Sequence, residues 1–166
     1  MASSASWWAS RTRQFRAHLR ARVAPAERAA LEAWTTRGQR TLFDSMHIAD
    51  RRHGLDVVSS LRADGATDPD LLQAGLLHDA GKGDTGVWPR VAYTLEARYG
   101  SWVPSTVSWL PGFASALERL RTHAETSAAL AAGAGCSSRT VELIRDQDAP
   151  TDPEFGELLR LADEAN

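Results

Sequence analysis

The apolar residues of this chain recur at helical spacing along nearly its whole length. No segment alternates apolar with polar residues as a half-buried strand does, and no Asn-Gly or Asp-Gly pair joins two segments rich in β-forming residues. This pattern predicts an all-α fold. With 166 residues, 43% of them hydrophobic and 24% charged, the chain can bury a core of ordinary size without disulfide bonds.

The single cysteine, Cys136, limits the chemistry open to the chain. It has no second thiol with which to form an intramolecular disulfide or a thiolate zinc site, so we expect a reducing compartment, the cytoplasm. A metal ion would therefore have to be held by histidine and carboxylate groups. No apolar run approaches the ~18 residues of a membrane-spanning helix. We take the heavy use of Ala, Arg and Leu as a sign of a GC-rich bacterial genome.

The N-terminal segment, residues 1–40, is basic, with eight Arg and two Glu, whereas residues 41–166 carry a net charge of −8. A narrow apolar stripe predicts a first helix within residues 1–22. Pro25 then begins a second helix, which Gly38 ends. We expect this Arg-rich helical hairpin to pack on the acidic main domain, with contact to nucleic acid or to a membrane surface as the alternatives.

The main domain is predicted to consist of helices joined by short loops. The segment 71–79 follows the start signal Asp68-Pro69-Asp70 and is almost wholly apolar, so we expect it to be buried on several sides. An irregular loop is expected over 100–111, where Trp, Pro and Ser gather. The predicted helices are 49–63, 71–79, 88–99, 112–132, 137–146 and 154–165.

A histidine and an aspartate, His78 and Asp79, stand together at the end of that apolar helix. Burial of an ionised carboxylate and an imidazole is costly unless something compensates them, and a divalent cation does so. The alternative is that the pair caps the helix and bonds to its backbone. His53 lies one helix upstream, His123 one helix downstream and Asp163 in the last helix, so a helical fold can bring these ligand types together.

At these residues the chain resembles the HD-domain superfamily of metal-dependent phosphohydrolases, whose pattern is a His, a His-Asp pair and a distant Asp on a helical scaffold. The segments 52–57, 74–82 and 159–163 carry the resemblance, which covers residues 41–166 and is strongest to small bacterial HD-domain proteins. It implies an HD-domain helical bundle over 41–166, preceded by the N-terminal hairpin. The metal ligands that the resemblance implies are His53, His78, Asp79 and Asp163.

The resemblance also implies roles around the ion, which would be Mn, Zn, Ni, Fe or Mg. Asp79 would orient the attacking water as well as bind the metal. Lys82 would lie beside a substrate phosphate, where an ammonium stabilises developing charge. Arg90 and Arg145 are further candidates for binding the substrate phosphate, chosen by charge.

A second metal ion is the point on which this chain departs from the fuller family pattern. His123 resembles the later histidine that binds a second ion in two-metal members, but Asp146 stands where such members often have histidine. A carboxylate can still ligate, so His123 and Asp146 remain a possible second site. We expect one ion, with His123 then serving as a substrate contact or general acid.

The function that the resemblance implies is a divalent-metal-dependent phosphohydrolase, which acts on a nucleotide or another small phosphoester through metal-activated water. Whether the ester is a monoester or a diester stays open. The chain lacks the acidic pair expected after His78-Asp79 in guanosine-tetraphosphate hydrolases, and it lacks a Gly-Tyr-Pro motif. Two alternatives stay open, a non-catalytic binding or regulatory module on the same fold and a di-iron oxygenase of the HD type.

Overall fold

The computed structural model describes residues 21–83, 118 and 120–166. Within these ranges all regular structure is helical and there is no strand, so the all-α prediction is confirmed there. In the same ranges, no helix combines the length and the apolar character needed to cross a membrane. Several predictions lie outside the described residues: the first basic helix as far as residue 20, the helix 88–99, the loop 100–111 and the start of the helix 112–132.

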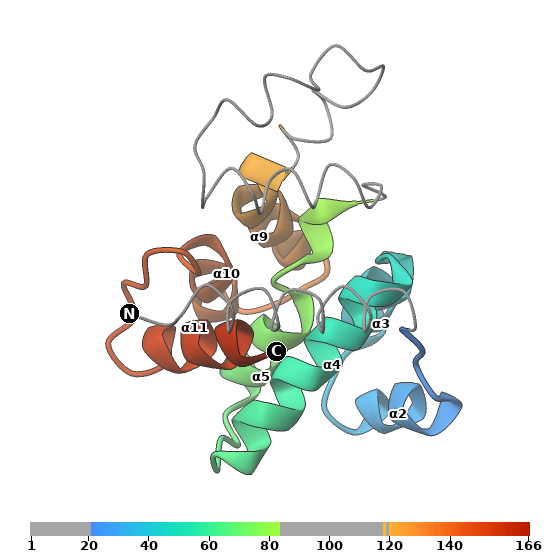
Figure 1. Ribbon diagram of the computed structural model, residues 1–166. Helices are drawn as coiled ribbons and strands as arrows, with labels where there is room; N and C mark the ends of the chain where they lie inside the picture. The colour runs from blue at the N-terminus through green and yellow to red at the C-terminus, as the bar shows by residue number, and fades with distance from the viewer. Residues whose placement is uncertain (1–20, 84–117, 119) are drawn as a thin grey trace, which may run out of the picture.

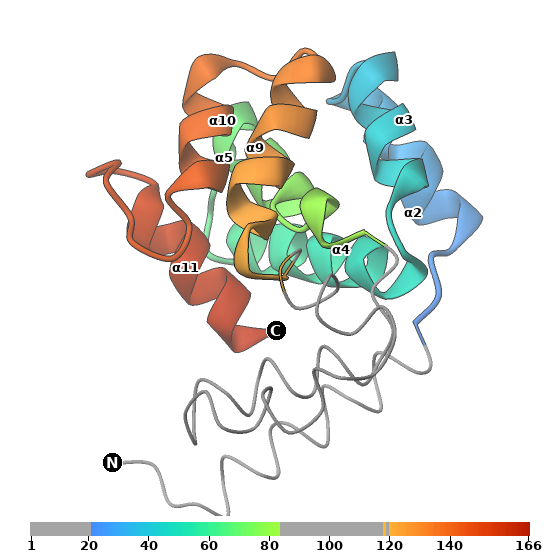
Figure 2. The ribbon, with the colours of Figure 1, turned by 90° about the horizontal axis from the view of Figure 1, so that it is seen from above.

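Seven α-helices and two short 3-10 helices form the described part of the fold (Figure 1). In both views α2 and α3 lie on one side of α4 and α11 lies on the other, while α9 and α10 run side by side (Figure 2). The elements in chain order are α2 (Pro25–Ala30), η1 (Leu31–Ala33), α3 (Arg37–Ser45), α4 (Ile48–Ala63), α5 (Pro69–Leu77), η2 (Ala80–Lys82), α9 (His123–Gly133), α10 (Ser138–Arg145) and α11 (Gly156–Ala165).

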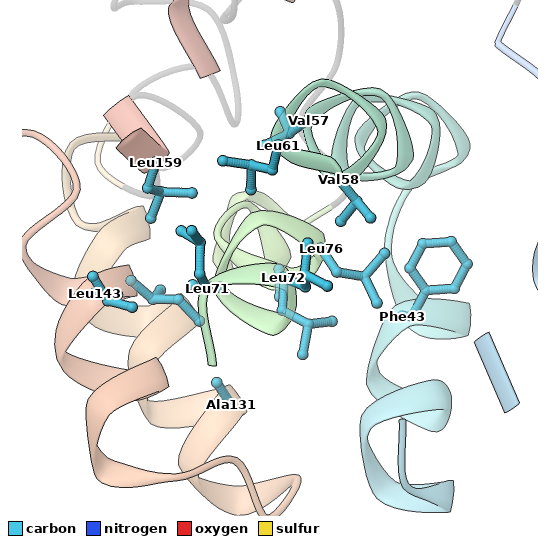
Figure 3. Packing of buried hydrophobic residues seen from close by; sticks show 14 of the residues in the cluster. Phe43, Val57, Val58, Leu61, Leu71, Leu72, Leu76, Ala131, Leu143 and Leu159 are labelled. Atoms are coloured by element: carbon cyan, nitrogen blue, oxygen red, sulfur yellow. The ribbon is translucent and has the colours of Figure 1, made fainter. Parts of the chain in front are cut away.

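Helix α5 is the centre of the core. It packs against α3, α4, α10 and α11, and its buried residues include a glycine, an alanine and four leucines. This confirms the prediction that it is buried on several sides. Figure 3 shows how side chains from the surrounding helices close over it, with Phe43 from α3, Leu143 from α10 and Leu159 from α11. The end of α5, where the His-Asp pair stands, is thereby anchored in the middle of the domain.

The predicted end of the second helix, at Gly38, is wrong. Gly38 does not end a helix; it is the second residue of α3, which runs without a break across residue 40. The physical reason is a capping box that begins α3: the Thr36 hydroxyl accepts from the Gln39 backbone N–H, and the Gln39 side-chain oxygen accepts from the Thr36 N–H at 2.8 Å. The preceding helix instead ends through η1, before the capping box begins.

Replacement of Thr36 by alanine is expected to lower the free energy of unfolding by about 1 kcal/mol, because the Gln39 N–H loses its acceptor. Thermal or denaturant unfolding measures this loss. Thr41→Ala is the matched control, because Thr41 lies exposed within α3 and alanine is a better helix former there. Equal destabilisation by the two substitutions would show that the capping box does not stabilise α3.

Most other helix starts agree with the sequence within two residues, because capping side chains mark them. Asp68 accepts from the Asp70 N–H at 2.8 Å at the start of α5, Ser137 caps α10, and Asp152 accepts from the Phe155 N–H ahead of α11. The exception is the predicted helix 112–132. The backbone bends at Thr122, and α9 begins at the next residue.

Candidate metal centre

Three of the predicted ligands converge from three helices. His53 lies on α4, His78 follows the last residue of α5, and Asp163 lies on α11, which packs against both other helices. One ligand atom from each of the three lies within 4.8 Å of the others. Asp163 Oδ1 accepts a hydrogen bond from His53 Nε2 at 2.7 Å and lies 3.3 Å from His78 Nε2. The carboxylate therefore sits between the two imidazoles.

The two imidazoles can meet because α4 and α5 approach closely at a glycine. A Cβ atom on Gly54 would lie 2.5 Å from the backbone oxygen of Leu76, closer than real Cβ atoms come. The ring centroids of His53 and His78 are 5.2 Å apart, with the rings edge to face. Gly54, the residue after His53, thus allows the helix contact that brings the two ring systems together.

Asp79 stands beside this cluster and is as deeply buried as His78, with exposed fractions of 3% and 1%. Its Oδ1 atom lies 3.5 Å from His78 Nε2. Both of these atoms are buried, and neither has a hydrogen-bond partner in the described part of the chain. Two facing polar atoms that are buried without a hydrogen bond cost free energy, and a cation bound by both would compensate them.

The electrostatics of the cluster follow from its burial and its mixed charges. Burial opposes the charged form of His78, but the carboxylates of Asp79 and Asp163 outweigh it and raise the pKa of His78 to about 9. Burial likewise opposes ionisation of Asp79, yet His78 and Lys82 hold the pKa of Asp79 far below its ordinary value. For Asp163, burial is outweighed by the hydrogen bond from His53 and the charge of His78, so its pKa is also lowered. Without a metal ion, the cluster is a compact set of ion pairs.

Backbone carbonyls set the orientation of two histidine rings. His78 Nδ1 donates to the Gly75 oxygen at 3.0 Å, and His123 Nδ1 donates to the Leu120 oxygen at 2.7 Å. A carbonyl oxygen can only accept, so Nδ1 carries the proton and Nε2 is the free ligand atom of each neutral ring. This is the arrangement that metal-binding histidines use to fix their tautomer.

The fourth ligand candidate, Asp79, also connects the cluster to Lys82 and His123. Lys82 Nζ donates to Asp79 Oδ2 at 2.6 Å, and His123 Nε2 lies 3.9 Å from Asp79 Oδ1. Burial and the Lys82 charge lower the pKa of His123, which favours its neutral form. With Nδ1 protonated, neutral His123 presents a lone pair at Nε2 near Asp79, where it can bind a cation or accept a proton.

The remaining predicted residues have other surroundings. Asp146 follows α10 and accepts a hydrogen bond from the Thr151 hydroxyl, while Arg145 pairs with Glu125 at 3.4 Å. Over residues 21–83, 118 and 120–166, no hydrogen bond or ion pair links Asp146 or Arg145 to the histidine cluster. Arg90 lies outside the described residues.

Two buried polar side chains near the His-Asp pair were not singled out from the sequence. Ser127 on α9 accepts a hydrogen bond from the Gly81 N–H at 2.7 Å, and Gln147 donates to the backbone oxygen of His78 at 3.4 Å. Ser127 is one helical turn beyond His123, so its position on the same face as a candidate site residue was a usable signal. Gln147 carried no comparable signal, because it stands between two aspartates in a polar stretch.

The side chains of this cluster differ in their exposure to solvent. The side chains of His53 and Asp163 keep exposed fractions of 25% and 42%, whereas those of His78 and Asp79 keep 2% and 3%. The cluster is therefore exposed to solvent at His53 and Asp163.

Comparison with known proteins finds no matching family model, no matching curated protein and no matching solved structure.

Proposed function

We propose that this chain is a divalent-metal-dependent phosphohydrolase of the HD-domain type. The observation that carries the proposal is the convergence of His53, His78 and Asp163 within 4.8 Å, from the consecutive helices α4 and α5 and from α11 near the end of the chain. Asp79 completes the candidate ligand set, because its buried Oδ1 lies 3.5 Å from the buried Nε2 of His78 and has no hydrogen-bond partner in the described residues. The order and types of these four residues are those of the family that the sequence resembles.

The donor set fits a single divalent ion. Two imidazole nitrogens and two carboxylates suit Mn, Zn, Ni or Fe, and fewer than six ligands leave room for water and a phosphate oxygen. The carbonyl partner of His78 directs its Nε2 atom toward the carboxylates. When bound, a divalent ion supplies Lewis acidity toward a phosphoryl oxygen and lowers the pKa of water.

The residues of the chain supply the remaining functions. Lys82 holds an ammonium group against Asp79, where it can bind a phosphate oxygen and stabilise negative charge that develops there. Its side chain keeps an exposed fraction of 25%, so an incoming phosphate can reach it. Neutral His123 can accept a proton or a substrate hydrogen bond at Nε2.

We expect the enzyme to act in the cytoplasm, since its only cysteine is a free thiol.

The first experiment is elemental analysis of the full chain purified without a metal-binding tag, followed by hydrolysis assays. About one divalent ion per chain is expected, together with hydrolysis of p-nitrophenyl phosphate, bis(p-nitrophenyl) phosphate or a nucleoside monophosphate that stops when the ion is chelated. Activity on the first or the second ester would separate a phosphomonoesterase from a phosphodiesterase.

Three other results would contradict the proposal. Absence of bound metal after incubation with Mn²⁺, Zn²⁺, Ni²⁺ or Fe²⁺ would favour a binding or regulatory module. Two irons per chain would favour the oxygenase, with His123 close enough to Asp79 to join a second site. Hydrolysis that survives in Asp79→Ala would show that the reaction takes place elsewhere.

A further inference from the structure

The turn that carries Asp79 and Lys82 is pressed directly onto the backbone of α9. A Cβ atom on Gly81 would lie 2.5 Å from the His123 oxygen and 2.6 Å from the Ser127 nitrogen. Gly81 of η2 therefore meets α9 at the turn between His123 and Ser127. Any sliding of η2 along α9 would change the position of Asp79 and Lys82 relative to His123.

One hydrogen bond spans this contact. The Gly81 N–H donates to Ser127 Oγ at 2.7 Å, a bond between residues far apart in the chain. Ser127 has an exposed fraction of 0%, and both its neighbour Ala128 and Ala131, one turn further on its face, are equally buried. A hydroxyl is costly to bury unless it is hydrogen-bonded, and here its partner is the backbone of the turn itself.

We propose that Ser127 is a positioning residue of the metal centre, which holds the Asp79–Lys82 turn in register with α9. It does not reach the ligand atoms; it acts through the Gly81 backbone, two residues after Asp79 and one before Lys82. This inference rests on the proposed function, because the register matters for activity only if Asp79 and Lys82 belong to the site. Groups that orient metal ligands from outside the coordination shell typically change metal affinity by about 10- to 100-fold when removed.

The test compares Ser127→Ala with Ser60→Ala in the full chain. Ser60 also accepts a side-chain hydrogen bond, from Asn166 at 2.9 Å, but it lies two turns beyond His53 on α4. Mn²⁺ binding is measured by calorimetry, and the visible spectrum of the Co²⁺-loaded protein reports the ligand geometry. Ser127→Ala is expected to weaken Mn²⁺ binding about 10-fold and to shift the Co²⁺ spectrum, whereas Ser60→Ala leaves both unchanged.

The outcomes separate this inference from the proposed function. If wild type binds Mn²⁺ and Ser127→Ala binds it equally well with the same Co²⁺ spectrum, the positioning role is wrong and the metal site stands. If wild type binds neither ion, the proposed function fails and the inference fails with it. Ser127→Cys keeps a weak acceptor at the same place, so partial recovery of Mn²⁺ affinity supports the hydrogen bond as the cause. Amide exchange of Gly81 in the metal-free protein should quicken in Ser127→Ala; unchanged exchange overturns the inference.

Discussion

Asp163→Asn is expected to weaken Mn²⁺ binding by about 100-fold or more while the helical fold remains. Asparagine keeps the shape of the side chain but removes the negative charge that lies between His53 and His78, at 2.7 and 3.3 Å. Loss of a charged ligand should exceed the roughly 10-fold loss expected for a supporting group. Calorimetric titration with Mn²⁺ and circular dichroism measure the two properties separately.

The metal-free form of the same variant provides a second readout. Burial disfavours the imidazolium of His78, and the charges of Asp79 and Asp163 overcome this and raise its pKa to about 9. Removal of one of these charges should therefore lower the pKa of His78, which NMR titration of the ring follows. Asp64→Asn is the control, because Asp64 is exposed at the far end of α4. Unchanged Mn²⁺ affinity in Asp163→Asn would remove Asp163 from the ligand set.

Gly54→Ala is expected to destabilise the protein by about 2 kcal/mol and to weaken metal binding as well. The new methyl group would lie 2.5 Å from the Leu76 backbone oxygen, so α4 and α5 must move apart. The higher helix propensity of alanine offsets only about 1 kcal/mol of that strain. The ring centroids of His53 and His78 are 5.2 Å apart in the present structure. Separation of the two helices would increase this distance.

Gly133→Ala is the matched control for this substitution. Gly133 is the last residue of α9, and a Cβ atom there would meet nothing within 4 Å. Alanine at this position should raise the free energy of unfolding by up to about 1 kcal/mol. Urea unfolding and Mn²⁺ titration of both variants provide the comparison. If Gly54→Ala is as stable as Gly133→Ala, the close contact between α4 and α5 does not set the geometry of the candidate site.

The candidate site was largely visible in the sequence because its residues are chemically distinctive. An apolar helix that ends in His78 and Asp79 is unusual, since burial of these groups is costly without compensation. The presence of His53 and Asp163 on predicted helices then made a shared site geometrically possible. The burial of α5 on several sides was predictable for a related reason, because a helix that is apolar all round has no face for solvent.

The differences arose where local signals compete. Glycine often ends a helix, but the capping box of Thr36 and Gln39 begins a helix that includes Gly38. No sequence signal as strong as proline marks the bend at Thr122. Because of this bend, His123 is the first residue of α9. Only its charge makes Arg145 a candidate for phosphate binding, and the structure pairs it with Glu125. Charge without geometry is weak evidence for a binding role.

From the sequence alone, the residue types, their order and the helical periodicity determined an all-α domain with candidate metal ligands on separate helices. These are local properties, readable from spacing and capping. Only the tertiary structure decided which of these side chains meet. The approach of α4 to α5 at Gly54, and the contact of η2 with α9 at Gly81 and Ser127, depend on long-range packing in which a few tenths of an ångström separate contact from clash.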